Sequence, residues 1–230
     1  EDVGFKAGSS SLPLPGYDVR VLDAETHEEM PVGELGSLAV KLPFPPGVMQ
    51  TLYNNDQRYV DAYLTEFGDG FYSAGDAGFI DGDGYLSVMA RTDDVINTAG
   101  HRLSTGQMEE IISTHPRVAE CAVIGADDNL KGQVPVGLVV LNAGQESDDE
   151  AKVIAEVILR VRESLGPVAA FKSAAVVPGL PKTRSGKILR GVIQKIANGK
   201  EYKLPGTIED VGPVDMAAEA LEGLGYPENI

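Results

Sequence analysis

The first ninety residues carry short apolar runs separated by turn residues. Gly, Pro and Asp punctuate three stretches that alternate or run apolar, which is the pattern of short β-strands: YDVRVLD (17–23), GSLAVKL (36–42) and GYLSVMA (84–90). The stretch at 54–66 instead predicts a short helix that is capped by Asn55 or Asp56. DGDG at 81–84 lacks the ligand spacing and closing glutamate of a calcium loop, so it predicts a tight hairpin turn.

From Asp94 onward the pattern changes to helices that alternate with apolar strands. Residues 104–116 have a Ser/Thr start, helical apolar spacing and a proline stop, and residues 148–166 have acids first and basic residues last, as a helix dipole prefers. VAECAVIG, VPVGLVVL and AAFKSAAVVPGL predict strands. SGKILRGVIQKIANG predicts a helix over 185–199, and a weak helical pattern follows near 215–224.

This change of pattern predicts the α+β class, with two parts that differ in structural style. Residues 1–92 form the β-rich part, residues 93–200 a small α+β domain, and residues 201–230 an acidic tail broken by Pro and Gly. Asp93 and Asp94 lie at the boundary, where a few residues absorb the backbone change if the two parts rotate.

Composition narrows the class of protein. The formal net charge of −16 argues against nonspecific binding to nucleic acid or to an anionic membrane. The single cysteine, Cys121, excludes an internal disulfide framework and a cysteine-based zinc site, which favours an intracellular setting. We find no apolar run long enough for a membrane span and no signal-peptide pattern at the start.

The positive charges gather in one region. Between Arg160 and Lys200 nine basic residues stand against one acid, Glu163, a local charge of +8. A basic region in an acidic chain suits one polyanionic small ligand, although a solvated helix face is the alternative. The region lacks the interleaved aromatic residues of a nucleic-acid surface.

Within that region, LPKTRSGKIL (180–189) places Lys187 after a serine and a glycine. The spacing of its glycines does not match a Walker phosphate loop, and Ile188 follows the lysine. Lys187 is instead predicted to lie on a flexible loop at the N-terminal end of a helix, where it could neutralise developing negative charge. The alternative is an ordinary basic surface loop.

A second set of candidate residues runs from Tyr72 to Arg102. Asp76 follows a predicted glycine turn, and Arg91 comes fifteen residues later, across the predicted hairpin. A carboxylate and a guanidinium at one end of a hairpin can both hydrogen-bond the vicinal hydroxyls of a ribose. Arg102 follows the glycine of TAGHR, where backbone can approach a ligand. Taken singly, each residue could equally be a turn acid or part of a surface salt bridge.

Taken together, the motifs resemble the adenylate-forming acyl-CoA synthetases. YSAGD (72–76), ARTDDVINTAGHRLSTGQMEEII (90–112) and LPKTRSGKILR (180–190) occur in order and at fitting spacing. The resemblance runs from the β-rich end of the family's large N-terminal domain, across a hinge, through the small C-terminal domain. Within the family the chain is most similar to the short-chain acetyl/propionyl-CoA synthetases. LPFPPG, DDVINTAGHRLSTGQMEE, HPRVAECAVIG and the late TIED favour the propionyl branch.

The resemblance implies a two-step ligase that uses ATP, Mg²⁺ and coenzyme A. A short-chain carboxylate first reacts with ATP to give an acyl-adenylate, and the thiol of CoA then displaces AMP. By position, the family's roles fall on residues of this chain as follows: ribose binding on Asp76 and Arg91, nucleotide phosphate on Arg102, the hinge on Asp93, the pantetheine channel on Ala99 and Gly100, CoA phosphate on Arg162, and adenylation on Lys187.

The resemblance also has implications for a metal site, for the extent of the enzyme and for its location. A magnesium ion would involve Ser113, His115 and Val118, although His115 before a proline also fits a helix-ending surface residue. The chain would be the C-terminal third of an enzyme in the cytoplasm or the mitochondrial matrix. Its partner would be the rest of the N-terminal domain of the same enzyme. It would bind neither nucleic acid nor a membrane. Ala90 and Ala99 depart from residues common in the family. A non-catalytic module that binds CoA or nucleotide is the alternative, and a carrier-loading adenylation domain is a weaker one.

Overall fold

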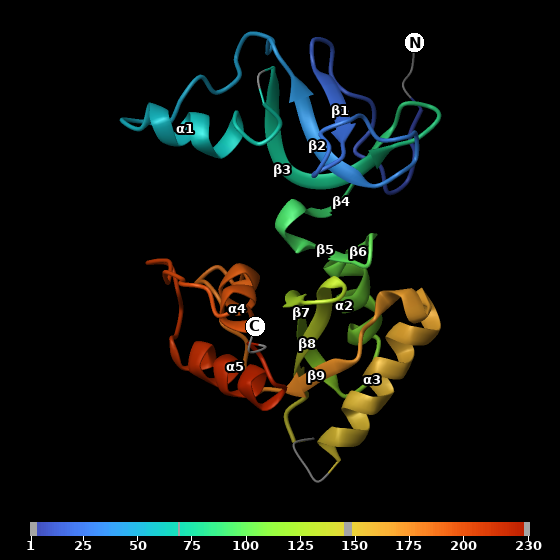
Figure 1. The fold of residues 1–230 in the computed structure, drawn as a ribbon, viewed down its shortest axis with the longest axis vertical. Coiled ribbons are helices and arrows are strands. Elements are labelled where there is room, and N and C mark those ends of the chain that lie inside the picture. Colours follow the sequence, from blue (N-terminus) through green and yellow to red (C-terminus); the bar gives the residue numbers. More distant parts are fainter. Residues whose placement is uncertain (1–3, 69, 145–148, 228–230) are drawn as a thin grey trace. The chain divides into compact units, whose positions relative to one another are not determined.

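The computed structural model describes residues 4–68, 70–144 and 149–227 (Figure 1). The chain forms two compact units, Glu1–Asp93 and Asp94–Ile230. The division coincides with the change in hydrophobic pattern, because each unit buries its own apolar residues.

Unit 1 contains a four-stranded antiparallel sheet with the strands in sequence order. The strands are β1 (Asp18–Leu22), β2 (Gly36–Lys41), β3 (Phe71–Ile80) and β4 (Leu86–Arg91). Helix α1 (Asp56–Tyr63) begins at Asn55, whose side chain accepts the N–H of Arg58. The predicted strands, helix and cap are confirmed, whereas the pattern did not reveal β3 because its two glycines, Gly75 and Gly78, weaken a strand signal.

The DGDG turn between β3 and β4 is a tight hairpin, as predicted. Asp81 Oδ1 accepts the backbone N–H groups of Asp83 and Tyr85, and the amide of Gly84 donates to the Asp81 carbonyl at 3.0 Å. Lys6 pairs with the carboxylates of both Asp81 and Asp83. The acidic residues therefore stabilise the turn and take part in a surface ion pair.

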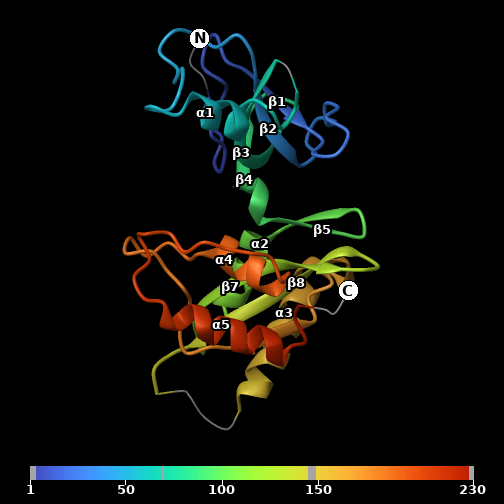
Figure 2. The ribbon, with the colours of Figure 1, turned by 60° about the vertical axis from the view of Figure 1, so that its left-hand side comes forward.

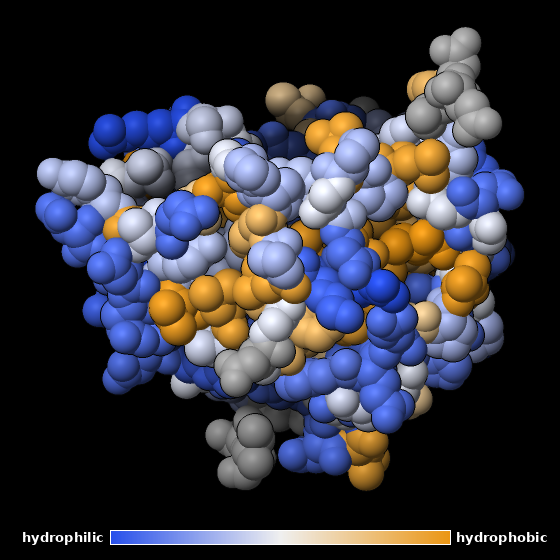
Figure 3. Space-filling model, turned by 90° about the horizontal axis from the view of Figure 1, so that it is seen from above, coloured by the Kyte–Doolittle hydropathy of each residue, from blue (hydrophilic) through white to orange (hydrophobic). Residues whose placement is uncertain are grey.

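Unit 1 has a small core and an apolar surface. Its buried cluster consists of Leu22, Ala39 and Phe67. Large apolar side chains of this unit remain exposed, among them Phe5, Leu14, Val32 and Tyr53. In the space-filling view, apolar patches lie between hydrophilic residues (Figure 3).

Unit 2 is built around a second sheet in which β8 is central. Its strands are β5 (Val95–Thr98), β6 (His101–Ser104), β7 (Val118–Asp128), β8 (Gly132–Leu141) and β9 (Ser173–Val176). β7 runs antiparallel to β8 along its whole length, β9 runs parallel to β8, and the β5–β6 hairpin joins β8 at Thr98 and Gly132.

Helices cover both faces of this sheet (Figures 1 and 2). One core lies under α2 (Thr105–Ser113) and α3 (Glu150–Leu165), the other under α4 (Arg190–Ala197) and α5 (Gly212–Gly223). Successive side chains of β7 point to opposite faces of the sheet, so this strand contributes to both cores. Cys121 and Val123 lie in the first core, and Ala122 and Ile124 lie in the second. The fold is α+β, as the sequence predicts.

Two expectations about unit 2 need correction. The helix predicted over 185–199 begins only at Arg190, because residues 182–188 form a hydrogen-bonded turn. His115 is 2% exposed and is not a surface residue. The weak helical pattern near 215–224 is confirmed as α5, which buries Val214, Ala217 and Leu221.

No helix among the described residues has the length and the apolar character that a membrane crossing needs.

Candidate functional site

In unit 1, the hairpin brings Asp76 and Arg91 together as predicted. They are directly opposite partners of β3 and β4, and Arg91 Nε lies 3.8 Å from Asp76 Oδ1. Asp76 lies inside a strand, so the glycine before it is not a turn. Gly75 has φ +71°, and a Cβ there would lie 3.3 Å from the Arg91 guanidinium. A glycine thus leaves room for Arg91 beside Asp76.

The boundary residue Asp93 lies in a short 3-10 turn, Thr92–Asp94, that links the last strand of unit 1 to the first strand of unit 2. The division between the two units falls directly after Asp93. Such a turn is short enough for a few dihedral angles to change the direction of the chain.

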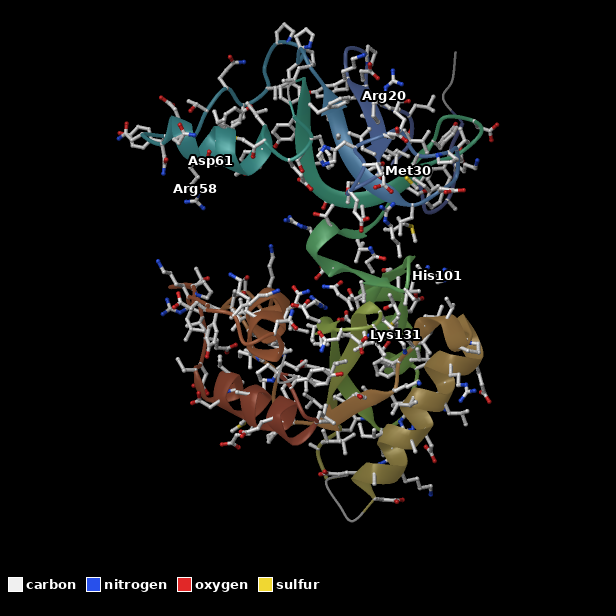
Figure 4. All side chains as sticks on the ribbon, viewed as in Figure 1. Arg20, Met30, Arg58, Asp61, His101 and Lys131 are labelled. Atoms are coloured by element: carbon white, nitrogen blue, oxygen red, sulfur yellow. The ribbon has the colours of Figure 1, made fainter. Side chains whose placement is uncertain are left out.

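Ala99 and Gly100 form the two-residue turn of the β5–β6 hairpin. Both have positive φ, +49° and +83°. This is the backbone of a type I′ turn, which costs energy at a non-glycine residue. The Ala99 amide donates to the carbonyl of Lys131 at 2.8 Å, which fixes the turn against the start of β8. His101 and Lys131 both lie at this end of the sheet (Figure 4).

Arg102 follows on β6, opposite Asn97 of β5, and its side chain is half-buried. The hairpin therefore holds Arg102 on a rigid strand within three residues of the strained turn. This arrangement supports the predicted backbone approach next to an arginine.

Lys187 lies at the end of a closed turn. The Thr183 amide donates to the Lys187 carbonyl at 2.9 Å, the Gly186 amide to the Thr183 carbonyl at 2.8 Å, and the Lys187 amide to Thr183 Oγ1 at 3.2 Å. Gly186 has φ +80°, which the turn requires and a side chain disfavours. The Lys187 side chain is exposed. The backbone is thus held while the ammonium group extends into solvent.

The basic region divides into paired and exposed residues. Lys182 binds Glu120 at 2.5 Å, Arg190 binds Glu109 with two hydrogen bonds, and Lys200 binds Asp127 at 2.7 Å. Within the described part of the chain, Lys187 and Arg162 form no such ion pair. The fold therefore neutralises some of the local positive charge and leaves those two residues available.

Arg162 lines a pocket of about 260 Å³ at the C-terminal end of α3. Lys172 lines it as well, together with Phe171 and Ala170. The only sequence signal for Lys172 was its place in the basic region. Two cations at one pocket suit a ligand that carries phosphate groups.

The predicted magnesium residues offer no free side-chain ligand. His115 Nε2 lies 2.9 Å from Glu156 Oε2, and its Nδ1 accepts the Arg117 amide. Ser113 Oγ donates to the Glu110 carbonyl. Among residues 4–68, 70–144 and 149–227, no three His, Cys, Asp or Glu residues cluster as metal ligands. These side chains therefore do not fit a metal ion.

Cys121 is a buried core residue, as predicted. Burial raises the pKa of its thiol to about 12, and Sγ donates to the Glu109 carbonyl at 3.4 Å. It is therefore a protonated, inert thiol at neutral pH.

Comparison with known proteins identifies the region around these residues. The family described as AMP-binding enzyme C-terminal domain matches residues 107–187. An uncharacterised protein of Pseudomonas aeruginosa is 50% identical over 93% of the chain, and human acyl-CoA synthetase short-chain family member 3, mitochondrial, is 47% identical over 94%. Propionate–CoA ligase of Escherichia coli is 40% identical over 96%. The chain spans about a third of these relatives, 34%, 31% and 36% respectively.

Solved structures agree. MatB from Rhodopseudomonas palustris, solved with ATP bound, matches 82% of the chain and 35% of its own with a TM-score of 0.63 at 29% identity. Acetoacetyl-CoA synthetase from Streptomyces lividans shares the fold over 94% of the chain and 32% of its own, with a TM-score of 0.78 at 23% identity. These comparisons confirm the resemblance of the motifs to the C-terminal part of adenylate-forming acyl-CoA synthetases.

Proposed function

We propose that this chain, whose residues 107–187 belong to the AMP-binding enzyme C-terminal domain family, is the C-terminal part of a ligase that joins a short carboxylate to CoA. The substrates would be acetate or propionate, ATP and CoA, and the products acyl-CoA, AMP and pyrophosphate. The observation that carries the proposal is the exposed Lys187 on its closed turn, in a chain that matches propionate–CoA ligase over 225 residues. The exposed apolar surface of unit 1 supports packing against the remainder of a larger domain.

In the first step, a carboxylate oxygen attacks the α-phosphorus of ATP and the bond to the β-phosphate oxygen breaks. Asp76 accepts hydrogen bonds from the ribose hydroxyls, and Arg91 donates to them. Arg102 donates to a phosphate oxygen, and Lys187 places its ammonium between the carboxylate and the α-phosphate, where negative charge develops. Mg²⁺ would travel with the ATP phosphates and supply charge neutralisation there.

In the second step, the CoA thiol loses its proton to solvent, its sulfur attacks the acyl carbon, and the bond between that carbon and the phosphate oxygen breaks, so that AMP leaves. Asp93 would be the hinge residue. Rotation of the chain at Asp93 would withdraw Lys187 from the reacting groups and bring in the Ala99–Gly100 turn, which would line the pantetheine channel. Arg162 and Lys172 would bind the phosphates on the nucleotide end of CoA in their pocket. The basic region seen in the sequence would thus contact ATP in the first step, through Lys187, and CoA in the second, through Arg162 and Lys172.

The proposal is tested by carboxylate-dependent exchange of pyrophosphate into ATP by the full-length protein that carries this chain. We expect exchange with acetate or propionate, and acyl-CoA formation once CoA is added. CoA binding without exchange for any carboxylate from two to eight carbons would contradict the ligase and favour the non-catalytic binding module.

The CoA assignment predicts the effect of Arg162→Ala. Loss of a charged hydrogen bond should raise the KM for CoA roughly tenfold to a hundredfold, while pyrophosphate exchange stays unchanged. Arg160→Ala is the matched control, because Arg160 lies on the same helix, donates to Thr114 Oγ1 and does not line the pocket. Steady-state kinetics with varied CoA measures both. An equal rise in KM for ATP would contradict the assignment.

A further inference from the structure

The first arm of the turn that carries Lys187, residues 182–184, is the middle of three paired chain segments. Residue 182 bridges to residue 188, on the arm that carries Lys187, and residue 183 bridges to residue 208 on the other side. Residue 208 comes well after the turn in the sequence, so the first arm is paired on both edges and holds the Lys187 arm against it.

Main-chain hydrogen bonds join the turn to this late segment. The Arg184 amide donates to the Thr207 carbonyl at 2.9 Å, and the Glu209 amide donates to the Lys182 carbonyl at 2.9 Å. Ile208 lies between these two bonds and is partly buried, whereas the Glu209 side chain is exposed. The pairing therefore depends on the backbone of Thr207–Ile208–Glu209 rather than on its charged side chains.

The late segment is itself anchored in the core of unit 2. It leads directly into α5, whose Ala217 and Leu221 belong to the same buried cluster as Leu180 and Ile193. Leu180 precedes the lysine turn and Ile193 follows it. One core therefore holds both ends of the turn and the segment that pairs with it. The region that matches the family ends at residue 187, so this segment lies beyond it.

We infer that residues 207–209 are a positioning element that holds the Lys187 turn in the geometry required for adenylation. The inference rests on the proposed function of Lys187. The two main-chain hydrogen bonds from this segment restrict the turn that positions the ammonium group of Lys187. A misplacement of a reacting group by about 1 Å costs on the order of 10² in rate. The element pairs with the turn through main-chain atoms, so its effect reaches the reaction through the turn, in the step that uses Lys187.

The test compares Glu209→Pro with Glu209→Ala in the full-length protein. Proline removes the amide that donates to Lys182, whereas alanine keeps it and changes only an exposed side chain. Hydrogen exchange of the Thr183, Gly186 and Lys187 amides reports the order of the turn. Pyrophosphate exchange and thioester formation from supplied acyl-adenylate report the two steps separately.

We expect Glu209→Pro to accelerate hydrogen exchange in the turn by roughly fivefold to tenfold and to slow pyrophosphate exchange by roughly tenfold to a hundredfold. Thioester formation should be unchanged, and Glu209→Ala should match the wild type in all three. If the proline variant also loses protection in β7 and β8, Ile208→Gly, which keeps every amide and loosens the segment, is judged by the same readouts.

Unchanged protection of the turn in Glu209→Pro would overturn the inference, as would faster hydrogen exchange with no loss of adenylation. Equal slowing of both steps would overturn it too, because it would indicate general damage. Failure of the proposed function looks different: the wild-type protein would then show no pyrophosphate exchange, while the hydrogen-exchange comparison would still decide whether residues 207–209 order the turn.

Discussion

Replacing Lys187 with alanine in the full-length protein is expected to slow pyrophosphate exchange by about 10²–10³-fold and to leave thioester formation from supplied acyl-adenylate nearly unchanged. The reason is that the ammonium group interacts with charge that develops only in the first step. The backbone amide and carbonyl of residue 187 hold the turn, whereas its side chain is exposed. The substitution should therefore alter stability by no more than about 0.5 kcal/mol.

Arg184→Ala is the matched control for that experiment. Arg184 lies on the same turn, its side chain is exposed, and its amide bond to Thr207 survives the substitution. It should keep both half-reactions within about twofold, since a screened surface charge contributes little. Single-turnover assays of each half-reaction measure the outcome. A Lys187→Ala variant that loses both steps equally would contradict the assigned role.

The second large effect is expected on stability, from Arg190→Met. Arg190 donates to both carboxylate oxygens of Glu109, at 2.8 and 2.7 Å, and its hydrogen bond with Glu109 raises the pKa of the guanidinium. The Glu109 side chain is only 15% exposed, and Oε1 also accepts the Val123 amide at 2.9 Å. Removing the arginine leaves a largely buried carboxylate without its cation, which should cost about 2–4 kcal/mol of unfolding free energy.

Urea unfolding followed by circular dichroism, with hydrogen exchange of the β7 amides to isolate unit 2, measures this loss. The double variant Glu109→Leu/Arg190→Met removes both charges and should recover most of the stability. Lys195→Met, an exposed change on the same helix, should lie within about 0.5 kcal/mol of the wild type. If Arg190→Met behaved like Lys195→Met, the pair would be only a surface contact.

Asp76 and Arg91 show how far local pattern reached towards the site. The DGDG turn is a local feature, and it placed the two residues at the same end of a predicted hairpin. Their direct pairing depends on an irregularity between Ala77 and Gly78 that shifts the register by one residue, and no local pattern predicted that shift. Lys172 could not be found in this way. It joins Arg162 only because the chain folds back after α3, and no periodicity encodes that return.

His115 and the start of α4 were misjudged for related reasons. A histidine before a proline looks like an exposed helix end, but α3 packs over it and supplies Glu156 from forty-one residues away. Helical spacing at 185–199 extended to the lysine turn, yet the turn's own hydrogen bonds, from the Thr183 amide to the Lys187 carbonyl and from the Gly186 amide to the Thr183 carbonyl, replace helix formation there. A distant segment outweighed the local preference at His115, and a closed turn did so at the start of α4.

The sequence by itself determined the α+β class, the division near Asp93, most elements and the choice of candidate site residues, because periodicity, turn residues and short motifs are local signals. Only the tertiary structure decided which basic residues are neutralised, which two line one pocket, and what holds the Lys187 turn. Those features arise from long-range pairing: Glu109 with Arg190, Glu120 with Lys182, and residue 183 with residue 208. Contacts of this kind depend on the closure of the whole core, which no short window of sequence contains.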